Sequence, residues 1–199
     1  VKKIMRKITI AANWKMYLDE RGSIDFIDKL NADKDLFSNK NIILFPSHAC
    51  IRSVKDHLDV NVKIGMQDCD MHNKGAYTGS TSINSIDIDS CIVGHSERRS
   101  TFKETSQDVA VQTPALLKQN ITPVICLDQP YLDEQIKELF SSNVNLSSCI
   151  FAYEPVSAIG SGQPESPERA EKVISKIALL TNQDSPVLYG GSISPQNVL

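Results

Sequence analysis

Three charged or titratable residues follow short apolar runs, at positions where side chains often carry out chemistry. Lys15 follows the first run, with Asn13 two positions before it, and His95 and Glu154 follow later runs. A lysine just past a buried strand can meet an anionic substrate, and a glutamate desolvated at the mouth of a strand becomes a useful base. A histidine followed at once by polar residues is not placed like a core histidine. Each is therefore a candidate site residue.

Each candidate also has an ordinary structural interpretation. Lys15 can be a solvated charge at the edge of a sheet, and Glu154 can pair with a neighbouring helix. His95 precedes Ser-Glu-Arg-Arg, which suits a short helix whose positive N-terminus disfavours an imidazolium. Arg98 and Arg99 can simply pair with carboxylates. Residue type and position alone leave these alternatives open.

An apolar loop directly follows Glu154 and has the composition of a lid. Ile159 can cover a site, and the backbone N–H of Gly160 can approach an anion. The predicted lid comprises Pro155, Val156, Ser157, Ala158, Ile159, Gly160, Ser161 and Gly162.

A glycine pair before Ser192 also suits phosphate binding. Gly190 and Gly191 precede Pro195, which can begin a helix, and the backbone of such a turn can hold a phosphate. A tight turn with no ligand is the alternative.

Seven short apolar runs predict the strands that position these residues. They lack clean alternation, which is typical of strands buried on both faces of a parallel sheet. The runs are 8–12, 41–45, 60–66, 90–94, 122–127, 147–153 and 186–189.

Helical spacing of apolar residues separates these runs. It predicts helices over 23–37, 103–119, 132–140 and 167–180, with a weaker one after Ser47 and the start of another at 195–199. Pro114 predicts a kink within 103–119, and Pro167 suits a first-turn position.

Alternating strands and helices predict an α/β fold with right-handed crossovers. A doubly wound sheet and a (β/α)8 barrel both fit. The first strand lacks GxGxxG, and GxxxxGK[ST] is absent from the 199 residues, which disfavours dinucleotide and P-loop sites. A barrel typically needs about 250 residues, and here the pattern stops after its seventh strand.

Composition predicts an ordinary soluble chain with one domain over residues 1–199. The formal charge of −3 disfavours nucleic-acid binding, and no run approaches the length of a membrane span. The five dispersed cysteines form no CxxC pair and no zinc-like cluster. We therefore expect a reduced, cytoplasmic protein without a metal. The basic N-terminus lacks the long apolar stretch of a signal peptide.

Taken together, the motifs resemble those of the triosephosphate isomerase family, in the family's order and across essentially the whole chain. They are ANWKM at 12–16, GAYTG at 75–79, VGHSERR at 93–99, AYEPV at 152–156, AIGSG at 158–162 and LYGGS at 188–192.

The resemblance implies a (β/α)8 TIM barrel that interconverts D-glyceraldehyde 3-phosphate and dihydroxyacetone phosphate without a cofactor. In that family's chemistry Glu154 moves a proton between two substrate carbons, and His95 polarises the carbonyl. Lys15 supplies positive charge to the substrate, and Asn13 lines the same pocket.

Further roles follow from the same resemblance. Gly160 and Ser192 hold the phosphate through their backbone as the lid closes, and Glu97 supports the site without touching the substrate. The lid excludes water, because an exposed enediolate phosphate can lose its phosphate.

The loop at 67–80 resembles the family's dimer loop and is long for a connection between a strand and a helix. The resemblance implies a homodimer in which Thr78 reaches the partner's site near Asn13. A flexible surface loop is the ordinary alternative.

Three departures from the family pattern stand out. The lid usually carries Trp where Ser157 stands, and the fifth strand usually ends Cys-(Val/Ile)-Gly-Glu where this chain has Cys126-Leu127-Asp128-Gln129. The 199 residues include no counterpart of the family's eighth strand, so we expect a C-terminally incomplete barrel. That absence supports the alternative of a non-catalytic barrel protein that binds a phosphosugar or a protein partner.

Overall fold

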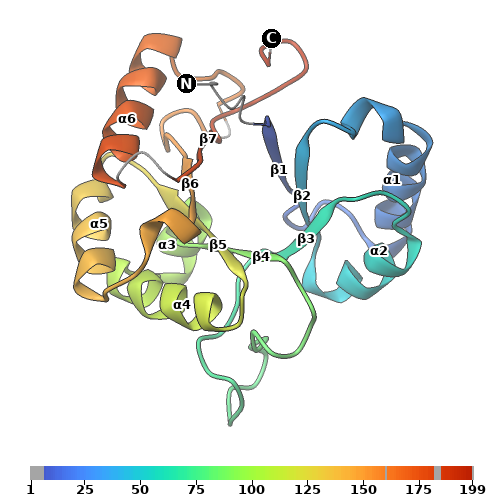
Figure 1. Ribbon diagram of the computed structural model, residues 1–199, viewed down its shortest axis with the longest axis horizontal. Helices are drawn as coiled ribbons and strands as arrows, with labels where there is room; N and C mark the ends of the chain where they lie inside the picture. Colours follow the sequence, from blue (N-terminus) through green and yellow to red (C-terminus); the bar gives the residue numbers. More distant parts are fainter. Residues whose placement is uncertain (1–6, 160, 182–184, 199) are drawn as a thin grey trace, which may run out of the picture. The chain divides into compact units, whose positions relative to one another are not determined.

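The computed structural model describes residues 7–159, 161–181 and 185–198 of the chain (Figure 1). It divides into two compact units. The N-terminal unit comprises residues 1–68 and 86–91, and the C-terminal unit comprises 69–85 and 92–199. The expectation of one domain over 1–199 stays a prediction.

The described residues form the seven predicted strands, paired in parallel in chain order from β1 to β7. This is the strand order of a TIM barrel. The strands are β1 (Thr9–Asn13), β2 (Asn41–Phe45), β3 (Lys63–Met66), β4 (Ser90–Val93), β5 (Thr122–Leu127), β6 (Ile150–Tyr153) and β7 (Val187–Tyr189).

The strands β3 and β6 each begin three residues later than predicted because the chain is still turning at the start of each run. The N–H of Val62 bonds to the carbonyl of Val60 before β3, and the 3₁₀ turn η3 (Leu146–Ser148) precedes β6. The ranges predicted for β2 and β5 are confirmed.

Six α-helices lie between the strands in the described residues, with two further 3₁₀ turns. The helices are α1 (Glu20–Ala32), α2 (Ile51–His57), α3 (Ser96–Phe102), α4 (Ser106–Lys118), α5 (Leu132–Ser141) and α6 (Pro167–Leu180), and the turns are η1 (Lys34–Phe37) and η2 (His48–Cys50).

Capping explains where two helix predictions were wrong. The α1 helix begins three residues early because the Asp19 carboxylate accepts the N–H of Gly22. The helix predicted over 103–119 begins three residues late, at Ser106, since a capping box between Thr105 and Asp108 starts α4. Pro114 stays inside α4 without ending it. The N-terminus of α6 is confirmed, with Ser166 as its N-cap.

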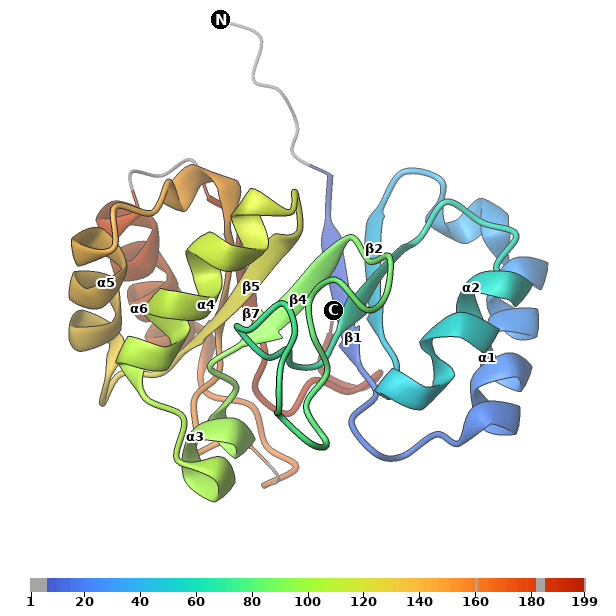
Figure 2. The same cartoon turned by 90° about the horizontal axis from the view of Figure 1, so that it is seen from below.

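In the N-terminal unit, α1 and α2 pack beside each other against β1–β3 (Figure 2). Their inward residues are fully buried: Ile27, Ile51 and Val54. Gly65 of β3 lies against the Phe45 ring, where a side chain would collide.

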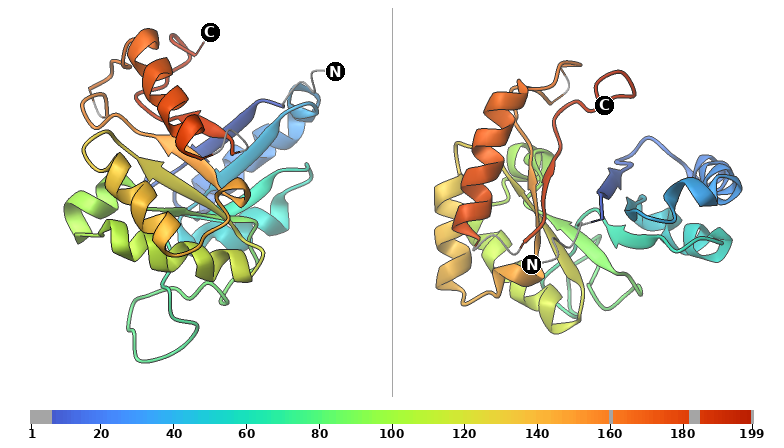
Figure 3. Two further views of the ribbon diagram at one scale, coloured as in Figure 1. Left: turned by 60° about the vertical axis from the view of Figure 1, so that its left-hand side comes forward. Right: turned by 45° about the horizontal axis from the view of Figure 1, so that its top comes forward.

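In the C-terminal unit, α4, α5 and α6 form a layer beside β5–β7 (Figure 3). Apolar residues from both layers are fully buried between them: Val109, Leu116, Ile125, Leu127, Leu139, Phe151 and Ile177. This packing fixes the carboxyl ends of β6 and β7, which Glu154 and Ser192 follow.

The chain after β7 forms a turn in place of the predicted helix start. The N–H groups of Asn197 and Val198 both donate to the carbonyl of Ser194. Leu199 lies outside the described residues. No helix in the described part of the chain is long and apolar enough to cross a membrane.

Candidate active site

The structure brings together His95 and Glu154, two of the predicted site residues. His95 follows β4, Glu154 follows β6, and the Nε2 atom of His95 lies 3.3 Å from Oε1 of Glu154. Both residues are buried, at 7% and 8% exposed. Charge is weakly screened in such a place, so a carboxylate and an imidazole act strongly on a bound molecule.

Local backbone geometry fixes the protonation pattern of His95. Its side chain caps α3, and its Nδ1 accepts the N–H of Glu97 at 3.1 Å. An Nδ1 that accepts a hydrogen bond carries no proton, so in a neutral ring the proton is on Nε2. That N–H faces Glu154, where it can donate to a substrate oxygen.

Glu154 is held by a second contact that sequence reasoning missed. Its Oε2 accepts the backbone N–H of Ser96 at 3.3 Å, in the first turn of α3. The partial positive charge of a helix N-terminus favours a carboxylate there. The polar run after His95 predicted the short helix that supplies this N–H. It gave no sign that the start of that helix contacts Glu154.

The thiol of Cys126, at the end of β5, lies beside Glu154. Burial raises the pKa of Cys126 well above its ordinary value, and the Glu154 carboxylate adds to this effect. The thiol is therefore neutral at physiological pH. All five cysteines are buried, and none of them forms a disulfide bond.

The predicted lid is a series of tight turns. The N–H groups of Ala158 and Ile159 donate to the carbonyl of Pro155, at 2.8 and 3.2 Å. Ser161 donates its hydroxyl to the carbonyl of Ala158 at 2.7 Å. Gly160 lies outside the described residues, so its predicted contact with phosphate stays a prediction.

The end of β7 contacts this lid directly. The Ser192 hydroxyl donates to the carbonyl of Ala158 at 2.5 Å. Ser192 has a positive φ of 49°, which is uncommon outside glycine and is often found at functional sites. A Cβ on Gly191 would lie 2.8 Å from Cγ of Pro155, so only glycine lets this backbone approach the lid.

Asn13 and Lys15 belong to the N-terminal unit, at the end of β1. The Asn13 side chain accepts the N–H of Lys15 at 3.0 Å, and Lys15 has a positive φ of 51°. The Gln67 side chain donates to the carbonyl of Lys15 at 2.8 Å. Gln67 is a positioning residue that sequence reasoning missed, having assigned it to the loop at 67–80.

Glu97 lies close to His95, and its predicted supporting role stays a prediction. Its Oε2 is 3.7 Å from Nδ1 of His95, and its side chain is about half exposed. Glu97 supports the histidine chiefly through its own backbone N–H.

The loop at 67–80 is exposed over most of its length. Thr78 is exposed, and the rings of His72 and Tyr77 stack with centroids 4.0 Å apart. His72 Nδ1 lies 2.7 Å from a carboxylate oxygen of Asp70. The loop has internal structure, and the predicted role of Thr78 stays a prediction.

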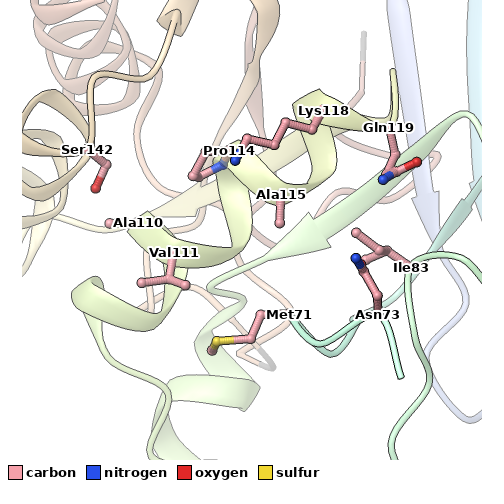
Figure 4. Close-up of a pocket in the computed structure, with 10 residues that line it drawn as sticks. All are labelled: Met71, Asn73, Ile83, Ala110, Val111, Pro114, Ala115, Lys118, Gln119 and Ser142. Atoms are coloured by element: carbon pink, nitrogen blue, oxygen red, sulfur yellow. The ribbon is translucent and has the colours of Figure 1, made fainter. Parts of the chain in front are cut away.

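A cavity of about 440 Å³ lies between this loop and α4 (Figure 4). Met71, Ile83, Val111 and Pro114 supply apolar walls, and Lys118 is at its edge. None of the predicted site residues lines it. The described residues contain no cluster of three or more metal-ligating side chains.

Known proteins share this arrangement of motifs. The family model described as triosephosphate isomerase matches residues 8–199. A protein named triosephosphate isomerase from Onion yellows phytoplasma is 32% identical, over 97% of this chain and 79% of that protein. One from Endomicrobium trichonymphae is 34% identical, over 98% of this chain and 87% of its own length. One from Flavobacterium psychrophilum is 32% identical, over 97% of this chain and 87% of its own length.

Proposed function

This chain belongs to the triosephosphate isomerase family, and we propose that His95 and Glu154 carry out the family's reaction in it. That reaction interconverts D-glyceraldehyde 3-phosphate and dihydroxyacetone phosphate. The observation that carries the proposal is the distance of 3.3 Å between Nε2 of His95 and Oε1 of Glu154 in a buried site.

Glu154 acts as the base. A proton next to a carbonyl is only weakly acidic, so its removal needs a desolvated carboxylate and stabilisation of the enediolate that forms. Glu154 takes the proton from one carbon and returns it to the neighbouring carbon. Its contact with the N–H of Ser96 holds the carboxylate in place until substrate arrives.

His95 acts as the electrophile. Its Nε2–H donates to the substrate oxygen that gains negative charge, while the N–H of Glu97 keeps Nδ1 unprotonated. A neutral histidine with a glutamate base is the established assignment in this family.

Lys15 and Asn13 bind the anionic substrate in this proposal, and Gly160 and Ser192 hold its phosphate beneath lid 155–162. The strained backbone of Lys15 and Ser192 supports these roles, because such conformations cluster at functional sites. No metal or organic cofactor takes part in the proposed steps.

We also propose a cytoplasmic homodimer that assembles through the loop at 67–80, with Thr78 reaching the partner's site. Buried cysteines that form no disulfide bond suit a reducing compartment. The exposed yet internally structured loop suits an assembly surface.

The test is turnover of D-glyceraldehyde 3-phosphate by the purified protein beside its Glu154→Gln variant. Gln keeps the shape of the side chain and removes the base. Turnover that the variant loses supports the assignment. A folded protein without turnover, or a variant as active as the unchanged protein, contradicts it.

A further inference from the structure

Glu165, three residues after the end of the lid, has a buried carboxylate with several partners. Its Oε2 accepts the hydroxyl of Tyr153 at 2.8 Å, and its Oε1 lies 3.3 Å from Nε of Arg169. Its backbone N–H donates to the Tyr189 hydroxyl, also at 2.8 Å. The Glu165 side chain is only 6% exposed, so these contacts fix the chain beyond the lid to the ends of β6 and β7.

A second buried carboxylate, Asp128, holds the beginning of the lid. Its Oδ2 accepts the N–H of Val156 at 3.2 Å, and its Oδ1 accepts the N–H of Gln129 at 2.7 Å. Asp128 stands where the family usually has glycine, and Val156 precedes Ser157, where the family usually has tryptophan. Asp128, one departure from the family pattern, therefore contacts the backbone of the residue just before Ser157, the other departure.

Both carboxylates raise the pKa of Tyr153, the residue before the proposed base Glu154. Burial raises the pKa of Tyr153, and the hydrogen bond and charge of Glu165 and the charge of Asp128 raise it further. The Tyr153 hydroxyl is therefore a proton donor throughout the neutral range, and Glu165 is its acceptor.

We propose that Asp128 and Glu165 are positioning residues that anchor the two ends of lid 155–162. The proposal rests on the function proposed above for the lid. Hydrogen bonds to a charged acceptor are about twice as strong as those between neutral groups. Such bonds at both ends confine movement to the residues between them and keep the closed lid in register with Glu154.

A loosened lid has a chemical signature that a purely structural defect lacks. Water that reaches the enediolate phosphate favours elimination. In that step the enediolate electrons form a new C=C bond while the C–O bond to phosphate breaks, so inorganic phosphate leaves with that bond's electron pair and the enol of a 2-oxoaldehyde remains. A misfolded fraction lowers isomerisation and elimination together. A loose lid raises the ratio of phosphate released to product isomerised.

The experiment measures that ratio for the purified protein with D-glyceraldehyde 3-phosphate as substrate. Glu165→Ala and Asp128→Ala remove the two acceptors, whereas Glu165→Gln and Asp128→Asn keep a neutral acceptor. Glu171→Ala, which changes an exposed glutamate of α6, is the control.

We expect each alanine variant to raise the ratio about 5-fold, the effect of losing one net hydrogen bond in the closed lid. The amide variants should recover most of the difference, and Glu171→Ala should match the unchanged protein. Tyr153→Phe removes the donor of the same hydrogen bond and only a hydroxyl, so it should also raise the ratio about 5-fold. It keeps the test possible if Glu165→Ala fails to fold.

Two results overturn the proposal, and they are distinguishable. An active protein whose Asp128 and Tyr153 variants keep the unchanged ratio shows that the ends of the lid are not anchored in this way, and the proposed function stands. A folded, unchanged protein without isomerisation overturns the proposed function and the anchor together.

Discussion

The hydroxyl of Ser192 donates to the carbonyl of Ala158 at 2.5 Å and so joins the end of β7 to the middle of the lid. Ala158 is buried, at 4% exposed, and Ser192 makes this contact from a backbone with positive φ. The residue proposed to hold phosphate through its backbone thus also holds the lid through its side chain. We therefore expect substrate binding and the position of the lid to be coupled at this point.

Ser192→Ala tests that coupling. It removes one hydrogen bond worth about 0.5–1.5 kcal/mol, so we expect kcat/KM to fall about 2- to 12-fold, chiefly through KM. Steady-state kinetics measures the change. Ser141→Ala, at an exposed position at the end of α5, should leave both constants unaltered. A KM that stays the same in Ser192→Ala would show that the lid is held by its backbone alone.

Glu154→Asp tests the distance over which the base acts. The shorter side chain withdraws the carboxylate by about 1 Å, which costs about 100-fold or more in kcat because proton transfer needs near-contact geometry. Single-turnover measurements should show the loss in the chemical step. Glu168→Asp, on the exposed first turn of α6, is the matched control. An unchanged kcat would remove Glu154 from the mechanism.

The sequence predicted those strands and helices whose own residues mark their ends, through an apolar run or a capping residue. After Thr122 the β5 strand is apolar and buried, and its range was predicted correctly. The α6 helix was predicted with its start, because Ser166 and Pro167 form a standard N-terminus. The start of α4 was predicted three residues early, at 103 instead of Ser106. It depends on Lys103, which adopts a left-handed conformation at φ 62° that its residue type does not announce.

The same distinction applies to the candidate site. His95 and Glu154 were identified because chemistry requires particular side chains there. The partners that hold the site were not, since the N–H of Ser96 belongs to any residue type and the contact between Asp128 and Val156 exists only once β5 and β6 are paired. Positioning contacts arise from the fold, so one sequence cannot show them.

Lys15→Met tests the role of the positive charge at the end of β1. Methionine keeps most of the length of the side chain, so the protein should stay folded while substrate binding and turnover fall by about 10-fold or more, the effect expected for a lost charge-assisted contact. Isothermal titration with dihydroxyacetone phosphate measures binding independently of catalysis. Lys29→Met, in the last turn of α1, controls for net charge. Unaltered binding would exclude Lys15 from the substrate site.

Alkaline pH should destabilise the protein through its buried thiols. Burial raises the pKa of Cys149 from 9.0 to about 12. Above pH 9 the unfolded chain loses this proton while the folded chain keeps it. The free energy of unfolding therefore falls as pH rises through that window, by at most about 1.4 kcal/mol per pH unit from this thiol. Urea unfolding at pH 8 and pH 10 measures the difference, and Cys149→Ala should reduce it. An equal loss in the variant would assign the effect to other groups.

Gly191→Ala tests how closely the end of β7 must approach the lid. A Cβ there would lie 2.6 Å from the hydroxyl of Tyr189 and 2.8 Å from Cγ of Pro155, both far inside normal contact distances. The first residue of the lid must then move, and we expect kcat/KM to fall about 100-fold, as for a misplacement of about 1 Å. Gly22→Ala is the control, because its Cβ would meet only flexible side chains at 3.2 Å or more. Full activity in a folded Gly191→Ala protein would mean that the lid functions with Pro155 displaced. The lid would then be positioned by hydrogen bonds at its ends and to Ser192, and not by this close packing.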